Sequence, residues 1–161
     1  MSNSKRTGSV DGPPMGLTPI LVVEDAAKAI DFYKRAFGAK EIARIAAPGG
    51  GLMHGRLELF GSIVVLMDDL PELRAMGVTA RPPAFLGGTP VTLHLQVADA
   101  RSAWDRAIAA GAISLIPLAD VFWGERYGRL RDPFGHEWTI AQMLQHLDDD
   151  QVRQAAIAAT R

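Results

Sequence analysis

The chain has 161 residues, and its 17 Lys and Arg against 18 Asp and Glu give a net charge of −1 at pH 7. This balance excludes the strong positive field that favours nucleic acid or anionic membranes, so we expect neither as a partner. The absence of Cys excludes disulfides, thiolate metal sites and cysteine nucleophiles. The length is sufficient for one domain with a substantial core, and we expect a cytoplasmic protein.

Residues 1–16 are polar and rich in Gly, Ser and Pro, and we expect a flexible arm there. They lack the apolar run of about 7 to 15 residues that forms the centre of a signal peptide. Nor is any apolar run close to the roughly twenty residues that cross a bilayer, since the longest covers residues 63–67. The rest of the chain is predicted to form one domain over residues 17–147 and a C-terminal helix over 148–161.

An internal repeat organises this domain. A shift of 74 positions aligns the segment that starts at Leu17 with the segment that starts at Val91. The matched pairs include Thr18 with Thr92, Leu21 with Leu95, Val23 with Val97, Asp25 with Asp99, Ala29 with Ala103 and Asp31 with Asp105. The domain therefore consists of two half-modules, residues 17–69 and 91–143.

Each half-module has the same predicted order of elements. A strand leads to an Asp suited to be a helix N-cap, and the helix ends at Gly38 in one copy and Gly111 in the other. Three strand-like runs follow each helix. They cover Lys40–Ala46, Met53–Phe60 and Ser62–Asp68 in the first half, and Ile113–Val121, Arg126–Arg131 and Glu137–Met143 in the second. Each half is thus a βαβββ unit, and the fold class is α+β.

Two further segments complete the chain. Residues 70–90 are rich in Pro and contain Gly87-Gly88, so we predict a connecting loop. In the tail, Asp148 and Gln151 have the spacing of a capping box at the start of a helix. No GxGxxG, P-loop, GxSxG or HExxH motif occurs in the chain, so dinucleotide, Walker-type, serine hydrolase and zincin chemistry have no support.

Several short motifs accompany the duplication: Phe32-Tyr33 in the first helix, Ala110-Gly111-Ala112 after the second, and DPFGHEW before the last strand. With them the chain resembles the vicinal-oxygen-chelate superfamily, which includes glyoxalase I, bleomycin-resistance proteins and extradiol dioxygenases. The stretch FWGERYGRLRDPFGHEW, Phe122 to Trp138, resembles the PhnB-like branch. The resemblance implies paired βαβββ modules that form a curved mixed sheet with an open cup. It does not imply one activity, since the scaffold hosts lyases, dioxygenases, epimerases and drug-binding proteins.

The resemblance also points to the positions of the superfamily's metal ligands. In this chain they hold Thr18, Thr92 and Thr139, with the fourth position at or next to Leu66. Hydroxyl and leucine side chains are poor ligands for zinc, nickel or ferrous iron. We therefore expect no cofactor and no metal at the usual site. The threonines are either wall residues of the cup or ordinary strand formers.

Two histidines are further site candidates. Strand alternation places Thr92, His94 and Gln96 on one face, so His94 is expected in the cup as a base or hydrogen-bond partner. In the strand from Met53, His54 and Glu58 share a face with Arg56. The set His54, Glu58 and His94 is the alternative that would hold a relocated divalent metal, with His94 and Glu58 as catalytic candidates.

Aromatic residues supply the remaining candidates. Trp123 and Tyr127 are expected to border the cup mouth, because small-molecule pockets combine aromatic walls with few polar groups. Core packing is the competing reading for Trp123 and Phe134. Asp132 and His136 are read as structural residues of the turn.

The leading hypothesis is a small-molecule-binding protein of the bleomycin-resistance type that sequesters an aromatic compound without the usual metal. Its predicted ligand-binding residues are Thr18, His54, Thr92, His94, Trp123, Tyr127 and Thr139. The alternatives are a glyoxalase-like lyase or isomerase, or a dioxygenase, with a relocated metal, and a dimer with no ligand. We expect a homodimer in which the connector permits the exchange of modules.

Overall fold

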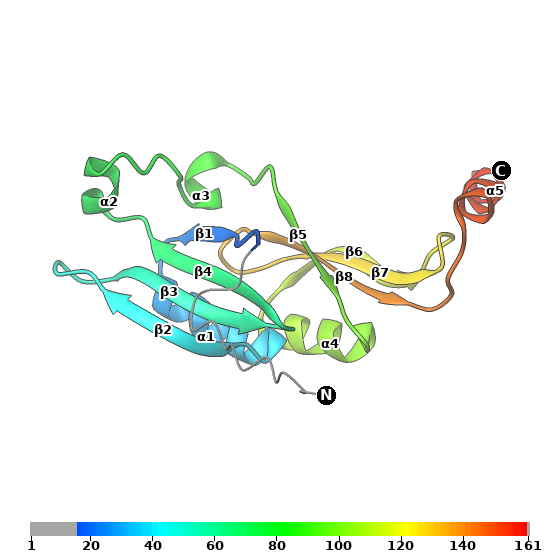
Figure 1. Ribbon diagram of the computed structural model, residues 1–161, viewed down its shortest axis with the longest axis horizontal. Helices are drawn as coiled ribbons and strands as arrows, with labels where there is room; N and C mark the ends of the chain where they lie inside the picture. The colour runs from blue at the N-terminus through cyan, green and yellow to red at the C-terminus, as the bar shows by residue number, and fades with distance from the viewer. Residues whose placement is uncertain (1–15, 161) are drawn as a thin grey trace, which may run out of the picture.

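The computed structural model describes residues 16–160 and confirms the two βαβββ modules. Residues 1–15 of the predicted arm lie outside the described part. Figure 1 shows the modules side by side along the long axis of the molecule. The first contains β1 (Ile20–Val23), α1 (Ala26–Phe37), β2 (Lys40–Ala46), β3 (Leu52–Leu59) and β4 (Ser62–Asp68). The second contains β5 (Thr92–Gln96), α4 (Ala100–Ala110), β6 (Ile113–Asp120), β7 (Glu125–Arg131) and β8 (Glu137–Met143).

Each module forms its own four-stranded mixed sheet. The strand orders are β1-β4-β3-β2 and β5-β8-β7-β6. In each, the first strand pairs in parallel with the last, and the other pairs are antiparallel. The α+β fold of paired modules is therefore confirmed, with the strands divided between two sheets.

The predicted helix ends are confirmed by their capping geometry. Asp25 accepts a hydrogen bond from the Lys28 N–H at 3.0 Å, and Asp99 accepts one from the Ser102 N–H at 2.9 Å. Gly38 ends α1 in the left-handed conformation with φ 66°. These contacts satisfy backbone groups that a helix end otherwise leaves without partners.

The connector and the tail contain three more helices. Residues 70–90 are not a simple loop, since they contain α2 (Pro71–Ala75) and α3 (Pro83–Leu86). Each of these helices starts at a Pro, whose fixed φ suits the first position of a helix. The predicted capping box is present at the start of α5 (Asp149–Ala159), none of whose residues is buried. No helix of the described residues is long and apolar enough to span a membrane.

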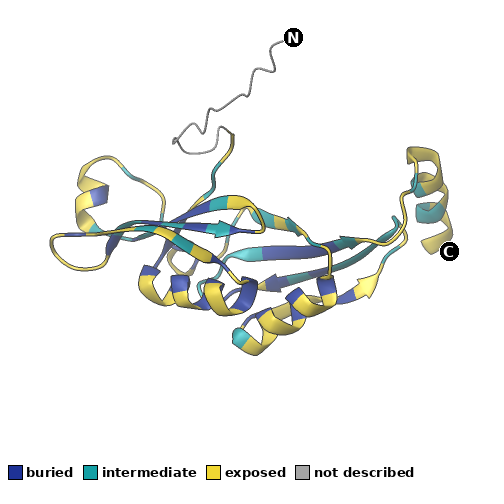
Figure 2. Ribbon diagram, turned by 60° about the horizontal axis from the view of Figure 1, so that its bottom comes forward, coloured by how far each residue is buried: buried dark blue, intermediate teal, exposed yellow. Residues whose placement is uncertain are grey.

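The two long helices cover one side of the molecule. Figure 2 shows α1 and α4 along the same side of the sheets, with their buried residues turned toward the strands. Two glycines permit this close approach: a Cβ at Gly55 would lie 3.0 Å from Ile30 Cδ1, and one at Gly128 would lie 2.6 Å from Trp104 Cζ3. Because the helices take this side, the opposite face of each sheet is left open.

A buried polar cluster joins the two modules. The Tyr33 hydroxyl donates to Asp132 Oδ2 at 2.5 Å, and Trp138 Nε1 donates to the same oxygen at 2.9 Å. The other oxygen of Asp132 accepts from the backbone N–H groups of Phe134 and His136. Asp132 is only 2% exposed. The structural role predicted for Asp132 is thereby confirmed, whereas His136 contributes only its backbone N–H to this cluster.

Burial raises the pKa of Tyr33 well above its ordinary value, and the Asp132 carboxylate adds to this effect. Both causes disfavour the phenolate. Tyr33 therefore stays protonated and serves as the donor that connects α1 to the turn between β7 and β8.

Candidate functional site

The open face of the second sheet carries a connected set of polar side chains. Alternate residues of a strand point to opposite faces. On β5, Leu93 and Leu95 pack against the core, whereas His94 and Gln96 are exposed on the other side. The predicted division of this strand is confirmed.

The pairing of the strands places three of these side chains in one row. His94 is opposite Thr139 on β8, and Thr139 is opposite Arg129 on β7. His94 Nδ1 lies 2.7 Å from Thr139 Oγ1. Thr139 is only 4% exposed, so its hydroxyl has little access to water. Thr139 thus fixes the Nδ1 edge of the histidine ring, and the rest of the ring is exposed on the open face of the sheet.

Gln96 holds the other nitrogen of this ring. With its carbonyl oxygen accepting from the Met143 N–H at 3.1 Å, its amide nitrogen lies 3.2 Å from His94 Nε2 and 3.3 Å from Glu125 Oε1. In this arrangement Nε2 accepts a hydrogen bond from the amide, so the ring hydrogen on Nδ1 points to Thr139. Thr139 and Gln96 therefore fix the orientation of the His94 ring.

Arg129 connects this row to two further residues. Its Nη2 donates to Thr92 Oγ1 at 2.6 Å and lies 2.6 Å from Glu137 Oε2. Arg131 Nη2 contacts the second oxygen of Glu137 at 2.9 Å. The hydrogen bond from Arg131 and the nearby charge of Arg129 lower the pKa of Glu137 below its ordinary value. The carboxylate of Glu137 thus balances the positive charge of Arg129 within the site.

An aromatic pair forms one end of this face. Trp123, in the turn before β7, meets Tyr127 edge to face with ring centroids 5.5 Å apart. The Trp123 indole N–H donates to Glu125 Oε2 at 2.8 Å. Both rings are partly buried, so each has surface left for a ligand. Phe134 lies elsewhere, against Phe32 and the module interface, and serves core packing.

The open face therefore combines an imidazole, a fixed guanidinium, threonine hydroxyls and an aromatic edge. These groups can form hydrogen bonds and stack on a planar molecule. We call this set the second-sheet site; it consists of Thr92, His94, Gln96, Trp123, Glu125, Tyr127, Arg129, Glu137 and Thr139.

Two of the predicted site residues also border a pocket. A pocket of about 580 Å³ lies between β1, β5 and the connector, and both Thr92 and His94 line it. The other lining residues are largely apolar and include Leu17, Ile20 and Leu86. Trp123 and Tyr127 are not part of this lining, so the described chain does not enclose all of the predicted residues in one cup.

The strand register places the fourth expected ligand position next to Leu66, as predicted. Leu21 pairs with Leu66 in the first sheet, as Leu95 pairs with Ile140 in the second. Leu66 is therefore the counterpart of Ile140, and the counterpart of Thr139 is the preceding residue, Val65. Thr18 precedes β1 and belongs to the first module, apart from the row of His94, Thr139 and Arg129.

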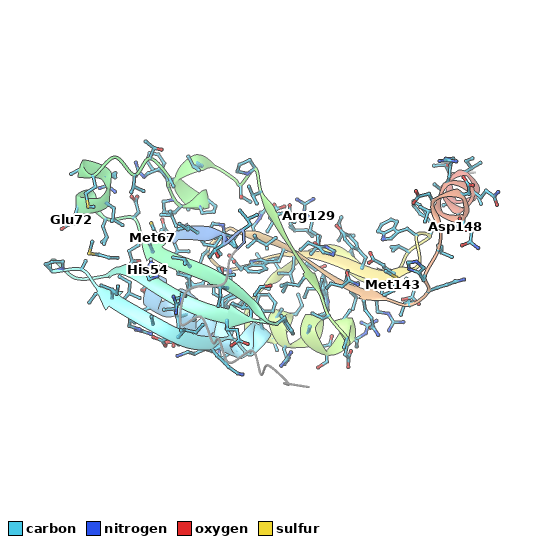
Figure 3. The ribbon with its side chains drawn as sticks, in the orientation of Figure 1. His54, Met67, Glu72, Arg129, Met143 and Asp148 are labelled. Atoms are coloured by element: carbon cyan, nitrogen blue, oxygen red, sulfur yellow. The ribbon has the colours of Figure 1, made fainter. Side chains whose placement is uncertain are left out.

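The alternative metal set is not assembled within this chain. His54 and Glu58 lie on β3 of the first sheet, whereas His94 lies on β5 of the second. Figure 3 shows His54 and Arg129 in the two different modules. Among residues 16–160, no group of three His, Cys, Asp or Glu side chains is placed to bind a metal ion.

Sequence reasoning did not identify every member of the second-sheet site. The unpredicted members are Gln96, Glu125, Arg129 and Glu137. A usable signal exists for Arg129, because strand alternation places it on the same face as Tyr127. The same alternation places Gln96 with His94, Glu125 with Tyr127 and Glu137 with Thr139, but the contacts of these side chains depend on turns and on the register between strands.

Comparison with known proteins assigns the chain to a family. Residues 16–140 match the family model of the Glyoxalase/Bleomycin resistance protein/Dioxygenase superfamily. An uncharacterized protein of Mycobacterium bovis is 45% identical over 139 residues, which are 86% of this chain and 90% of that protein.

Solved structures agree with this match. TioX from Micromonospora sp. ML1 superposes with a TM-score of 0.64 and 29% identity, over 81% of this chain and 100% of TioX. The PhnB protein from Bacillus cereus has a TM-score of 0.58 over 78% of this chain and 98% of its own. At 17% identity, the latter shows the shared fold alone.

Proposed function

Because the chain belongs to the Glyoxalase/Bleomycin resistance protein/Dioxygenase superfamily, we propose that it binds a small aromatic molecule at the second-sheet site without a metal ion. The fold alone cannot support this choice, since it carries several chemistries. The proposal rests on the side chains that occupy the site. We also propose membership of the PhnB-like branch, supported by the stretch from Phe122 to Trp138.

One observation carries the proposal: the threonine hydroxyls of the second module are engaged by neighbouring side chains. Thr139 Oγ1 lies 2.7 Å from His94 Nδ1, and Thr92 Oγ1 accepts from Arg129. A neutral hydroxyl is a poor metal ligand. In the first module, the counterpart of Thr139 is Val65, which offers no donor atom. In the second module, the positions that hold metal ligands in the superfamily thus form hydrogen bonds with neighbouring side chains.

The ligand would use the two ends of this surface differently. Its ring would pack on Trp123 and Tyr127, where an aromatic contact adds about 0.5 to 1.5 kcal/mol beyond the buried area. Its polar atoms would replace Gln96 as the hydrogen-bond partner of His94 Nε2. Sequestration fits these groups, because they bind and orient a molecule.

A thermal-shift screen with a library of aromatic drugs and metabolites tests the proposal. A ligand at 100 times its Kd adds about 2.7 kcal/mol of stability. We expect at least one compound to raise the Tm of the protein and to lose most of that effect in Trp123→Leu. Phe85→Leu is the matched control, because Phe85 is 64% exposed and lies in α3, outside the site. The absence of any shift, or equal shifts in both variants, would contradict the proposal.

We further propose that the protein is a homodimer. In the single chain, the face that carries the aromatic pair is open, and Ile113 and Ile116 on the edge strand β6 are exposed. Exposed apolar patches beside polar rims are typical of interaction sites. A second copy that covers this face would shield both the isoleucines and a bound ring.

A further inference from the structure

The open face of the first sheet carries an arginine that matches Arg129 of the second. Gly55 pairs with Leu66 as Gly128 pairs with Ile140, and the next residues, Arg56 and Arg129, are therefore equivalent. In both arginines the Nε atom is buried and has no hydrogen-bond partner. The duplicated modules thus place one guanidinium at the same point of each sheet.

The two guanidinium groups differ in how their charge is balanced. Arg129 contacts Glu137, which pairs with Arg131 across the strands. The counterpart of Glu137 is Ile63, which pairs with Glu58. The second module therefore supplies a carboxylate where the first supplies an alkyl group.

No carboxylate of residues 16–160 forms an ion pair with Arg56, in contrast to the two that involve Glu137. Glu58 and His54 share its face of β3, but the structure contains no hydrogen bond from either to Arg56. The cross-strand neighbours of Arg56 are Val65 and Ala43, and Ile20 lies beyond Val65. Arg56 is partly buried and its cross-strand neighbours are apolar, and a partly buried cation is costly unless an anion pairs with it.

We infer that Arg56 is an anion-binding site for a small organic acid, separate from the second-sheet site. Because Nε is buried, the two Nη donors of the planar guanidinium would meet the two oxygens of a carboxylate. The apolar neighbours Ile20, Ala43 and Val65 would contact the carbon body of the acid. Ile20 is 56% exposed and so has surface to bury.

Hexanoate is the probe, because it has a carboxylate and an aliphatic body but no ring for the aromatic pair. Titration followed by amide NMR shifts would show saturable changes in β3 and β4 for hexanoate, and much weaker ones for hexanamide. Charge-assisted pairs of this kind justify an expected loss of affinity of about tenfold or more in Arg56→Gln. Arg56→Lys would keep part of the affinity, because the charge remains while the paired donors are lost.

Arg101→Gln is the control, since it removes an exposed arginine of α4. The inference is overturned if hexanoate does not bind, if hexanamide binds equally well, or if Arg56→Gln binds hexanoate like the native protein. It is also overturned if Arg56→Gln converts a dimer into monomers without any hexanoate effect, since a carboxylate of a second copy would then fill the place. The spectrum of each variant shows whether it is folded. Binding of aromatic compounds at the second-sheet site is independent of all these results.

Discussion

At the scale of single residues, His94 shows what strand alternation can and cannot predict about a side chain. The period of two correctly predicts that His94 lies on the open face, because Leu93 and Leu95 must be buried. Its contact with Thr139 could not be predicted, since the two residues are 45 positions apart and meet only through the pairing of β5 with β8. The tautomer of the ring depends on this contact and on Gln96.

Tyr33, in the core, also has a contact that the sequence pattern does not predict. The sequence places it on the buried stripe of α1, but its partner Asp132 is 99 positions away. Tyr33→Phe removes a donor to a buried carboxylate, and we expect the free energy of unfolding to fall by about 1 to 3 kcal/mol. Urea denaturation at about pH 8 would measure this loss.

The raised pKa of Tyr33 adds a dependence on pH. In the unfolded chain a tyrosine ionises near its ordinary value of 10.0, whereas the buried one stays protonated at higher pH. The stability contributed by Tyr33 is thus complete below about pH 10 and is lost as the pH rises further. The difference between the native protein and Tyr33→Phe should therefore narrow at about pH 11. A difference that stays constant would show that Tyr33 ionises normally.

At the scale of elements, the duplicated pattern predicts the three strands after each long helix to within one residue. The Asp caps and the glycines that end the helices are local signals, which is why the helix ends agree with the structure. The connector was predicted wrongly as a loop, because its prolines also suit the first turn of α2 and α3.

Gly128 tests how the helices rest on the sheets. In Gly128→Ala the new Cβ would lie 2.6 Å from Trp104 Cζ3 and 3.0 Å from Leu118 Cα. Overpacking of this kind typically costs about 1 to 3 kcal/mol, so we expect a clear decrease in Tm. In Gly49→Ala the new Cβ meets only the flexible end of Glu72, which makes it a matched control with little effect. Equal Tm values for the two variants would refute this account of the packing.

At the scale of the whole molecule, the two modules are joined through their helices and through the Asp132 cluster. The open faces of both sheets lie on the side away from α1 and α4 (Figure 2). The duplication predicts two similar sheets, but not how they are placed, because that depends on contacts between the modules. For the same reason, the predicted cup residues are divided among the β1–β5 pocket, the aromatic pair and the first sheet.

The proposed dimer is tested by light scattering on the full chain. We expect a mass of twice the 17.3 kDa of one chain. Ile116→Glu should shift the protein toward monomers, since Ile116 pairs with Arg129 and shares its open face. Ile108→Glu, on α4, is the control and should leave the mass unchanged. A monomeric native protein would exclude the proposal.

Metal-independent binding at the second-sheet site is the central claim, and one titration tests it most directly. The Kd of an aromatic compound found in the screen would be measured by tryptophan fluorescence on chelator-treated protein, with and without added zinc, nickel or ferrous ions. We predict the same Kd in every sample and a large loss of affinity in His94→Ala. Binding that disappears after chelation and returns with one equivalent of metal would contradict the claim.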